Sequence, residues 1–414
     1  MSAKSKNSDA FSADQQRRHR LGHAWLVFFQ AATVVGIIAL MALLLNIINS
    51  SFGFVLLEDT VSRESLSPSG VALEDLSRDD LVTIFNDNVS TGLFTRYERE
   101  KPFQQRTQAD VYALVIDFVV EPEIKEQWSL VDSLLNRDEI QAIAINEHPQ
   151  GHLEFRNWLD WDFVRSPQSS FVELAGVRTA IFGSLWTIAI AILFAFPVGV
   201  GAAIYLEEYA EDTFISRIVQ TNINNLAGVP SIIYGILGLA IFVRALEPLT
   251  SGSFFGVADP LTANGRTILS AGLTLGLLVL PLIIINAQEA IKAVPNSLRR
   301  ASSGLGATRW QTIWHHVLPG ALPGILTGTI LAISRAIGET APMVVIGAST
   351  FIQVDPSGPF SKFTTLPIQI FQWTARPQDV FRNLAAAASL TLLIMLLTMN
   401  ASAIFLRNRY GKKQ

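Results

Sequence analysis

The sequence predicts an α-helical polytopic membrane protein with six transmembrane helices and a small α+β insertion after the first. Of its 414 residues, 50% are hydrophobic and only 16% are charged, whereas roughly 25% are charged in an ordinary soluble domain. Six stretches are apolar over the roughly 20 residues that a helix needs to cross a bilayer core. They lie at residues 24–48, 179–205, 226–246, 268–290, 322–348 and 384–406.

The first apolar stretch follows Arg17, Arg18 and Arg20, as a secretory signal would. It is too long for a typical signal core and no A-x-A site follows promptly, so we interpret it as an uncleaved anchor. Residues 1–20 are polar without an apolar period, which favours a disordered tail. The chain has no cysteine, which excludes disulfides, thiolate metal sites and cysteine nucleophiles.

Lysine and arginine in short loops mark the cytoplasmic side of a membrane protein. With the N-terminus inside, the short inner segments hold fourteen of these residues and the short outer segments hold five. We therefore expect a multi-pass protein of the bacterial inner membrane with both termini cytoplasmic. The predicted parts are a cytoplasmic tail at 1–23, a helix at 24–48, an extracytoplasmic insertion at 51–170 and a transmembrane domain at 171–410 with a cytoplasmic loop at 291–320.

The insertion reads as a folded domain. The run Val111–Val120 is typical of a β-strand, and Ser77–Asp80 opens a capped helix through Phe85. Trp128, Trp158 and Trp161 add apolar bulk. The sequence assigns no chemistry to this domain.

Two histidines of the insertion raise the question of a metal site. His148 and His152 are four residues apart, but Pro149 and Gly151 between them make a helix improbable. A metal site also needs further ligands in fixed geometry. We interpret both as solvated loop histidines and predict no metal site.

Two small-xxx-small patterns lie on separate spans, Gly272 with Gly276 and Gly324 with Gly328. Such patterns permit close approach of neighbouring helices. Glycine is also simply frequent in membrane helices. The sequence leaves both readings open.

The loop at 291–320 carries the most specific signals. Pro295 is expected to end the preceding helix. A new short helix is then predicted from about Leu298 to Leu305, and Gly306 ends it. Thr308 with Gln311 is a capping box that begins a second helix.

This second helix carries an apolar stripe at helical spacing, namely Trp310, Ile313, Trp314 and Val317. Leu318-Pro319 is predicted to close it as the chain re-enters the membrane. Two short helices around a glycine corner would make a rigid element for a partner to push. Alternatively, the tryptophans anchor the loop in the lipid interface. Spacing alone favours neither interpretation.

The loop resembles the cytoplasmic EAA-x3-G-x9-I-x-LP loop of ABC importer permeases. The match is Arg300-Ala301-Ser302, then Gly306, His316 at the isoleucine position and Leu318-Pro319. Arg300 for glutamate and His316 for isoleucine depart from the motif. The resemblance implies that Arg300, Ala301, Ser302, Gly306, Leu318 and Pro319 belong to a loop that docks on an ATPase subunit.

Four segments narrow the resemblance to phosphate permeases of the PstA type. They are Phe196–Tyr209, Asn225–Gly235, Ser334–Pro342 and Leu366–Gln378. The resemblance implies a permease subunit of an ATP-driven phosphate importer. Its implied partners are an ABC ATPase dimer that uses the ATP, a second permease subunit, an extracytoplasmic phosphate-binding protein and membrane lipid, but no nucleic acid and no directly bound cofactor. The insertion at 51–170 departs from the compact members of the family.

Arg335 and Glu339 are predicted near the middle of the fifth span, four residues apart on one helix face. A charge there costs at least about 2.5–3.5 kcal/mol, so it is kept for a reason. One interpretation is a structural ion pair. The other is that Arg335 offers its planar fork of donors to an oxyanion while Glu339 moderates the charge. The resemblance associates both residues with the translocation pathway.

Several functional classes are disfavoured by missing motifs. The sequence contains no phosphate-binding P-loop, no H-E-x-x-H zinc motif and no G-x-S-x-G elbow. We therefore expect that this chain is not an enzyme. The alternatives that remain are a permease for another oxyanion, such as sulfate or molybdate, and an ion-coupled secondary transporter, although repeated halves with broken helices are not visible.

Overall fold

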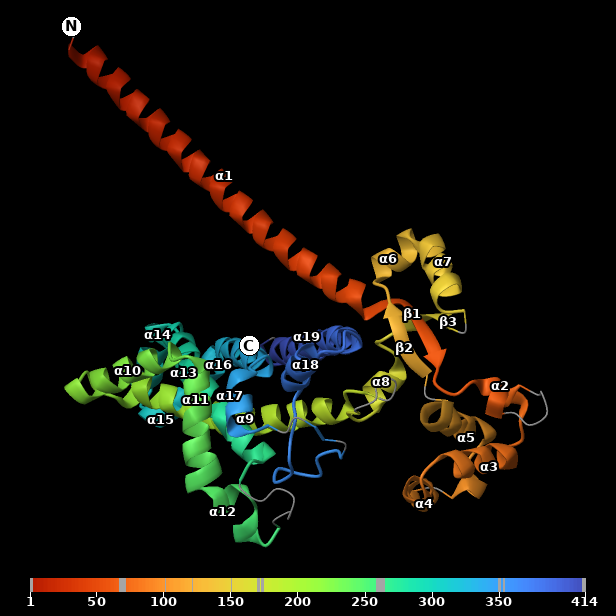
Figure 1. Ribbon diagram of the computed structural model, residues 1–414. Helices are drawn as coiled ribbons and strands as arrows, with labels where there is room; N and C mark the ends of the chain where they lie inside the picture. The colour runs from red at the N-terminus through yellow and green to blue at the C-terminus, as the bar shows by residue number, and fades with distance from the viewer. Residues whose placement is uncertain are drawn as a thin grey trace.

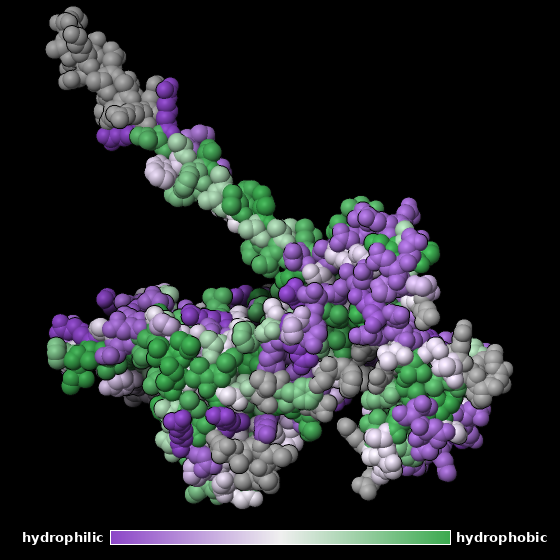
Figure 2. All heavy atoms as spheres, in the orientation of Figure 1, coloured by the Kyte–Doolittle hydropathy of each residue, from purple (hydrophilic) through white to green (hydrophobic). Residues whose placement is uncertain are grey.

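The chain forms a bundle of long apolar helices with a smaller domain inserted after the first helix (Figure 1). The computed structural model describes residues 3–66, 72–100, 102–120, 122–149, 151–169, 172, 175–257, 265–348, 351–352 and 354–411. Hydrophobic surface follows the first helix and covers much of the bundle, whereas hydrophilic surface covers the sheet region of the insertion (Figure 2). This distribution matches helices that meet lipid and an insertion that meets water.

Among the described residues, five helices have the length and apolarity to cross a membrane, or six if one bent pair counts as a single span. The main helices of the five spans are α1 (Ala3–Ser51), α9 (Arg178–Ile204), α13 (Ile268–Lys292), α16 (Leu318–Ile337) and α19 (Val380–Gly411). The prediction of a six-span α-helical membrane protein is confirmed at this level.

The bent pair replaces the straight span that the sequence predicted at 226–246. α10 (Phe214–Ala227) and α11 (Ser231–Gly238), which continues as the π-helix η5 (Leu239–Ala245), meet at 106°. Gly228 and Pro230 lie in the break. Proline has no N–H to donate and its ring disfavours a helical residue before it, so the helix restarts after Pro230 in a new direction.

α9 and α13 pack side by side and run parallel, because Gly272 faces Ile190 while Gly276 faces Phe194 one turn further along both helices. A Cβ on Gly276 would lie 2.7 Å from the Phe194 ring. The close approach that this small-xxx-small pattern permits is therefore present.

α13 and α16 pack antiparallel through the second pattern. Gly324 faces Ala290, and Gly328 faces Asn286 one turn earlier on α13. A Cβ on Gly328 would lie 2.3 Å from the Cβ of Asn286. Both glycine pairs thus serve helix packing.

α1 begins at Ala3, so the predicted disorder of residues 1–20 is wrong within the described range. This stretch contains no proline and no glycine before Gly22. A helix already nucleated in the apolar part gains one hydrogen bond for each residue added, so it extends into the polar part. The apolar window of α1 is wholly exposed within the chain, and the helix packs against α19.

The insertion is built around a three-stranded antiparallel sheet in the order β2-β1-β3. The strands are β1 (Phe52–Asp59), β2 (Pro122–Gln127) and β3 (His152–Asn157). The helical elements are α2 (Arg63–Leu66), η1 (Leu73–Asp75), α3 (Arg78–Asn88), α4 (Thr91–Glu100), η2 (Phe103–Gln105), α5 (Gln108–Val115), η3 (Ile116–Val120), α6 (Leu130–Leu135), α7 (Arg137–Glu147) and α8 (Trp161–Arg165). The predicted small α+β fold is confirmed.

Within the insertion, the capped helix is confirmed and the β-run is wrong. The Ser77 hydroxyl accepts from the Asp80 amide at the start of α3. Residues 111–120 form α5 and the π-helix η3 instead of a strand, because Thr107 and Asp110 close a capping box just before them. Val111, Leu114 and Val115 then bury one helical face.

The sheet end of the insertion packs on the bundle through one shared hydrophobic cluster. Leu57 of β1, Trp158 and Phe163 contribute from the insertion, and Trp373 of α18 (Leu366–Thr374) and Leu384 of α19 contribute from the bundle. Of the predicted tryptophans, Trp158 is buried in this cluster whereas Trp161 is exposed.

The other described elements of the bundle are short. They are α12 (Glu247–Thr250), η6 (Ser253–Phe255), α14 (Asn296–Gly304), α15 (Arg309–Thr312), η8 (Ile313–Val317) and α17 (Ala341–Ile346), and the π-helix η4 (Tyr205–Tyr209) follows α9.

Candidate functional site

The loop between α13 and α16 contains the two predicted short helices. α14 starts at Asn296, slightly earlier than expected. Gly306 follows with φ of +85°, a conformation that side chains rarely adopt. The Thr308 and Gln311 side chains make both bonds of the predicted capping box at the start of α15. The glycine corner between two helices is therefore confirmed.

Leu318-Pro319 does not end the second helix, and this prediction is wrong. α15, the π-helix η8 and α16 form one continuous helix from Arg309 to Ile337. Pro319 lies in the first turn of α16, directly after the wider π turn. A proline at that place removes one helical hydrogen bond without breaking the helix. The loop thus passes directly into a membrane span.

The corner presents apolar side chains to solvent. Leu305 is 90% exposed beside Gly306, and Arg300 and Ala301 are also exposed on α14. Trp310 and Trp314 stack with ring centroids 5.5 Å apart and are about half exposed. Of the predicted stripe, only Ile313 and Val317 are buried, and Val317 packs in a cluster with residues of α9, α13 and α16.

Buried contacts hold the two short helices together. Ser302 is buried, and its hydroxyl lies 2.9 Å from that of Thr312 across the corner. Leu318 and Pro319 are partly buried, whereas His316 is exposed on η8. Of the residues matched to the family motif, Arg300, Ala301 and Gly306 are therefore on the outer side and Ser302 on the inner side.

A cleft of 530 Å³ lies between this loop and the end of α9. Its charged lining comprises Glu207 and Glu208 of η4, Lys292 of α13, Arg299 of α14 and Arg309 of α15. Sequence reasoning missed the roles of these side chains. Two adjacent carboxylates at the end of a membrane span, facing a basic loop, are the signal that could have found them.

Arg335 and Glu339 do not share one continuous helix, which corrects the prediction. α16 ends at Ile337 and α17 starts at Ala341, so Arg335 is in the last turn and Glu339 lies in the break. Gly338 caps α16, and Pro342 at the start of α17 cannot donate to the preceding turn. The predicted span at 322–348 is thus a broken helix.

The two charges nevertheless pair. Arg335 Nε lies 3.5 Å from Glu339 Oε1, with the arginine side chain 49% exposed and the glutamate 18%. The neighbouring Ser334 donates to Asn400 of α19 at 2.7 Å, and α17 packs against α11 on the other side of the break. The break therefore lies among α11, α16 and α19, and a half-exposed guanidinium is held there beside a carboxylate.

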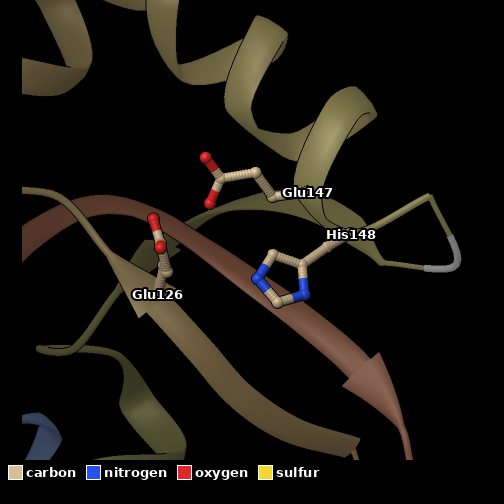
Figure 3. A group of neighbouring side chains, drawn as sticks. All are labelled: Glu126, Glu147 and His148. Carbon is tan, nitrogen blue, oxygen red and sulfur yellow. The ribbon is translucent and has the colours of Figure 1, made fainter.

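His148 is more enclosed than the predicted solvated histidines. Its ring Nδ1 lies 3.5 Å from a Glu58 oxygen, and its side chain is 24% exposed. Glu126, Glu147 and His148 bring one potential ligand atom each within 4.8 Å of one another (Figure 3). Glu147 is exposed, and exposed acidic groups gather in this way without an ion, so the cluster alone assigns no metal site. His152 is exposed at the start of β3, not in a loop, and is not a member of this group.

Comparison with known proteins decides the family. The family described as binding-protein-dependent transport system inner membrane component matches residues 195–413. This range is more than half of the chain and contains both the loop and the helix break. The chain belongs to this family. As an inner membrane component, it is a multi-pass membrane protein and a subunit of a transport system.

Individual relatives agree with the family. The probable ABC transporter permease protein YqgI of Bacillus subtilis is 30% identical over 269 residues, which are 62% of this chain and 85% of that protein. The phosphate transport system permease protein PstA 1 of Mycobacterium tuberculosis is 36% identical over 236 residues, 56% of this chain and 70% of that protein. The predicted resemblance to permeases of the PstA type is confirmed. Among solved structures, one chain of a bacterial alginate ABC transporter is similar over 77% of this chain and 98% of that chain, with 17% sequence identity and a TM-score of 0.44.

Proposed function

We propose that this chain is the transmembrane permease subunit of an ATP-driven phosphate importer. The observation that carries the proposal is the 36% identity to the phosphate transport permease PstA 1 over 236 residues. It is supported by the family match at residues 195–413, which includes the exposed loop and the broken helix. The proposed partners are a second permease subunit, which completes the passage, and an extracytoplasmic phosphate-binding protein, which delivers the substrate.

The loop from α14 to α15 is proposed to dock on the ATPase. Leu305, Trp310 and Trp314 offer exposed apolar area at a corner whose backbone is fixed by Gly306, the Thr308 capping box and the Ser302–Thr312 bond. Exposed apolar side chains on a rigid element are typical of the centre of an interface. Because the sequence contains no P-loop, ATP hydrolysis is assigned to the partner ATPase subunits.

Arg335 is proposed to contact the phosphate as it crosses. A guanidinium presents several N–H donors in one plane, which suits phosphate oxygens. Glu339 at 3.5 Å lowers the net positive charge of the site. Weaker net attraction favours release, which conduction requires as much as binding. The helix break supports this role, because irregular backbone at membrane depth is tolerated where it lines a water-filled cavity or is buried in protein, and Arg335 at this break is half exposed.

Transport in reconstituted vesicles tests this function. The chain would be purified with its partner permease and ATPase subunits and placed in vesicles with ATP on the ATPase side. Labelled phosphate should accumulate when phosphate-loaded binding protein is supplied, and an ATPase subunit that cannot hydrolyse ATP is the control. Uptake of sulfate or molybdate in place of phosphate would reassign the substrate. Uptake driven by an ion gradient without ATP would identify a secondary transporter.

A further inference from the structure

Two adjacent carboxylates at the end of α9 hold separate elements of the cytoplasmic end. Glu207 and Glu208 lie in η4, at the same end of the bundle as α10, α14 and α15 (Figure 1). Glu208 accepts from Arg299 of α14, and Glu207 accepts from Gln288 of α13. Each carboxylate therefore connects α9 to a different partner.

Arg299 is the centre of the first connection. Its Nε and Nη2 donate to one Glu208 oxygen at 3.0 and 2.7 Å. Its Nη1 donates to the carbonyl of Val294 at 2.7 Å, and its Nη2 also donates to the carbonyl of Ile291 at 2.9 Å. One guanidinium thus joins α14 to the ends of both α9 and α13.

Both side chains of the Arg299–Glu208 pair are largely shielded from water. The Arg299 side chain is 22% exposed and the Glu208 side chain is 10% exposed. A partly desolvated charge pair with several hydrogen bonds resists separation, because removal of either partner leaves the other charge without compensation. An exposed ion pair, by contrast, holds its elements only weakly.

The second connection extends to α10. Gln288 donates to Glu207 at 3.0 Å and exchanges amide hydrogen bonds with Gln220 of α10 at 2.8 and 3.2 Å. Lys292 of α13 adds an ion pair with Glu207 at 3.3 Å. The polar network around η4 therefore spans α9, α10, α13 and α14.

Apolar packing also joins these helix ends. Ala203 of α9, Ile291 and Val294 near the end of α13 and Val317 of η8 form one buried cluster. The cluster holds the membrane helices together but includes no residue of α14. Arg299 supplies the polar contact from α14 to α9.

We propose that the Arg299–Glu208 pair is the rigid link that passes movement of the docking loop to α9, while Glu207 with Gln288 passes it on to α10. This inference rests on the proposed function, because it assumes that an ATPase moves α14. Arg299, Glu207 and Glu208 are positioning residues in this scheme and do not touch the substrate. Loss of the link should separate ATP hydrolysis from transport.

The link is tested in the assembled complex with Arg299→Gln and Glu208→Gln. Hydrogen exchange is measured in α14 and η4 with and without ATP, which requires no substrate. In the unaltered complex, ATP should change exchange in both elements together. In the variants, the ATP-dependent change should remain in α14 and disappear from η4. If the pair were merely structural, its loss would raise hydrogen exchange in η4 by the same amount with and without ATP, so the ATP-dependent change in η4 would remain. That result would overturn the proposal.

Transport provides the second readout. The amount of phosphate moved per ATP hydrolysed should fall about tenfold in both variants, which lies within the usual range of coupling between two sites. Arg299→Lys keeps the positive charge but loses the planar set of guanidinium donors. Its ratio of phosphate moved to ATP hydrolysed should therefore lie between those of Arg299→Gln and the unaltered chain.

The matched control is Arg217→Gln, which breaks the largely exposed ion pair with Asp212 at the same end and should change neither readout. Unaltered exchange and transport ratios in both link variants would overturn the link while leaving phosphate transport intact. If the unaltered complex moves no phosphate, the proposed function is contradicted. The hydrogen-exchange experiment would still test whether the Arg299–Glu208 pair transmits movement, because it requires no substrate.

Discussion

At the scale of single residues, Arg335 and Glu339 pair across a turn between two helices and not along one helix face. Their spacing suggested two side chains one turn apart on one helix, but Gly338 ends α16 between them. The ion pair is present across this break, with Arg335 Nε 3.5 Å from Glu339 Oε1. This arrangement leaves the guanidinium half exposed, which a buried structural pair would not require.

The double variant Arg335→Gln with Glu339→Gln separates the two interpretations of this pair. If the pair only stabilises the fold, removing both charges leaves no charge without its partner, and transport should persist. We expect instead that the complex assembles and hydrolyses ATP but takes up at most about a tenth of the normal phosphate, because the anion loses a charge-assisted partner. Uptake of labelled phosphate by reconstituted vesicles measures this.

The control for this experiment is Arg382→Gln with Asp379→Asn, which removes an exposed ion pair of 2.8 Å and should leave uptake unchanged. Assembly with the ATPase is measured for both double variants, so that misfolding is not mistaken for a blocked passage. Normal uptake by the Arg335 variant would leave the pair as a packing feature.

The site could be predicted from the sequence only where its residues are close in the chain. The Thr308–Gln311 capping box and the Gly306 corner are local, and both were predicted. The Arg299–Glu208 pair joins residues 91 positions apart, so the adjacent carboxylates at the end of a span are visible in the sequence but their partner Arg299 is not. The resemblance marked the Arg300 position of the loop motif, whereas the buried contact to α9 is made by Arg299.

At the scale of elements, the apolar pattern predicted where helices lie better than where they bend or end. Residues 111–120 are apolar in nearly every position, so a strand and a buried helix fit equally well, and the capping box at Thr107 decided for the helix. The break after Ala227 arises from Gly228 and Pro230, which hydropathy alone does not register. Pro319 leaves a helix intact because it directly follows the wider π turn of η8, whereas Pro230 lies in the break between α10 and α11.

Close helix packing makes Gly328→Ala a test of the contact between α13 and α16. The added Cβ would lie 2.3 Å from the Cβ of Asn286, an atom next to the backbone that cannot swing away. The helices must separate, at a cost of about 1–3 kcal/mol. We expect a lower thermal unfolding temperature of the purified protein in detergent.

Gly201→Ala on α9 is the matched control for Gly328→Ala. Nothing lies within 4 Å of the added Cβ there. Alanine also favours the helix over glycine, so this variant should be at least as stable as the unaltered chain. Equal unfolding temperatures for Gly328→Ala and the unaltered chain would contradict the packing described for α13 and α16.

At the scale of the whole molecule, the insertion is part of the bundle's outer structure. Phe163 and Trp373 have ring centroids 6.1 Å apart, and Asn383 of α19 donates to Gln127 of β2 at 2.7 Å. The insertion therefore joins α18 and α19 at the end of the bundle where α9 begins. The docking loop lies at the other end of α9, beside η4, so the insertion and the loop are separated by the length of a span.

Their separation by a span predicts that the insertion and the docking loop are labelled from opposite sides of the membrane. The chain contains no cysteine, so Ile145→Cys on α7 and Ser303→Cys on α14 each introduce a single exposed thiol. Because lysine and arginine are in excess on the loop side, we expect that side to face the cytoplasm. In intact cells that express the chain without its ATPase, a membrane-impermeant maleimide should therefore label Ile145→Cys, whereas Ser303→Cys should react only after the membrane is opened. Leu193→Cys is the control, since its position is 78% exposed on the apolar span α9 and should meet lipid and remain unlabelled in both conditions. Labelling of Ile145→Cys and Ser303→Cys from the same side would show that the chain crosses the membrane differently, and labelling of Ser303→Cys alone in intact cells would reverse the orientation.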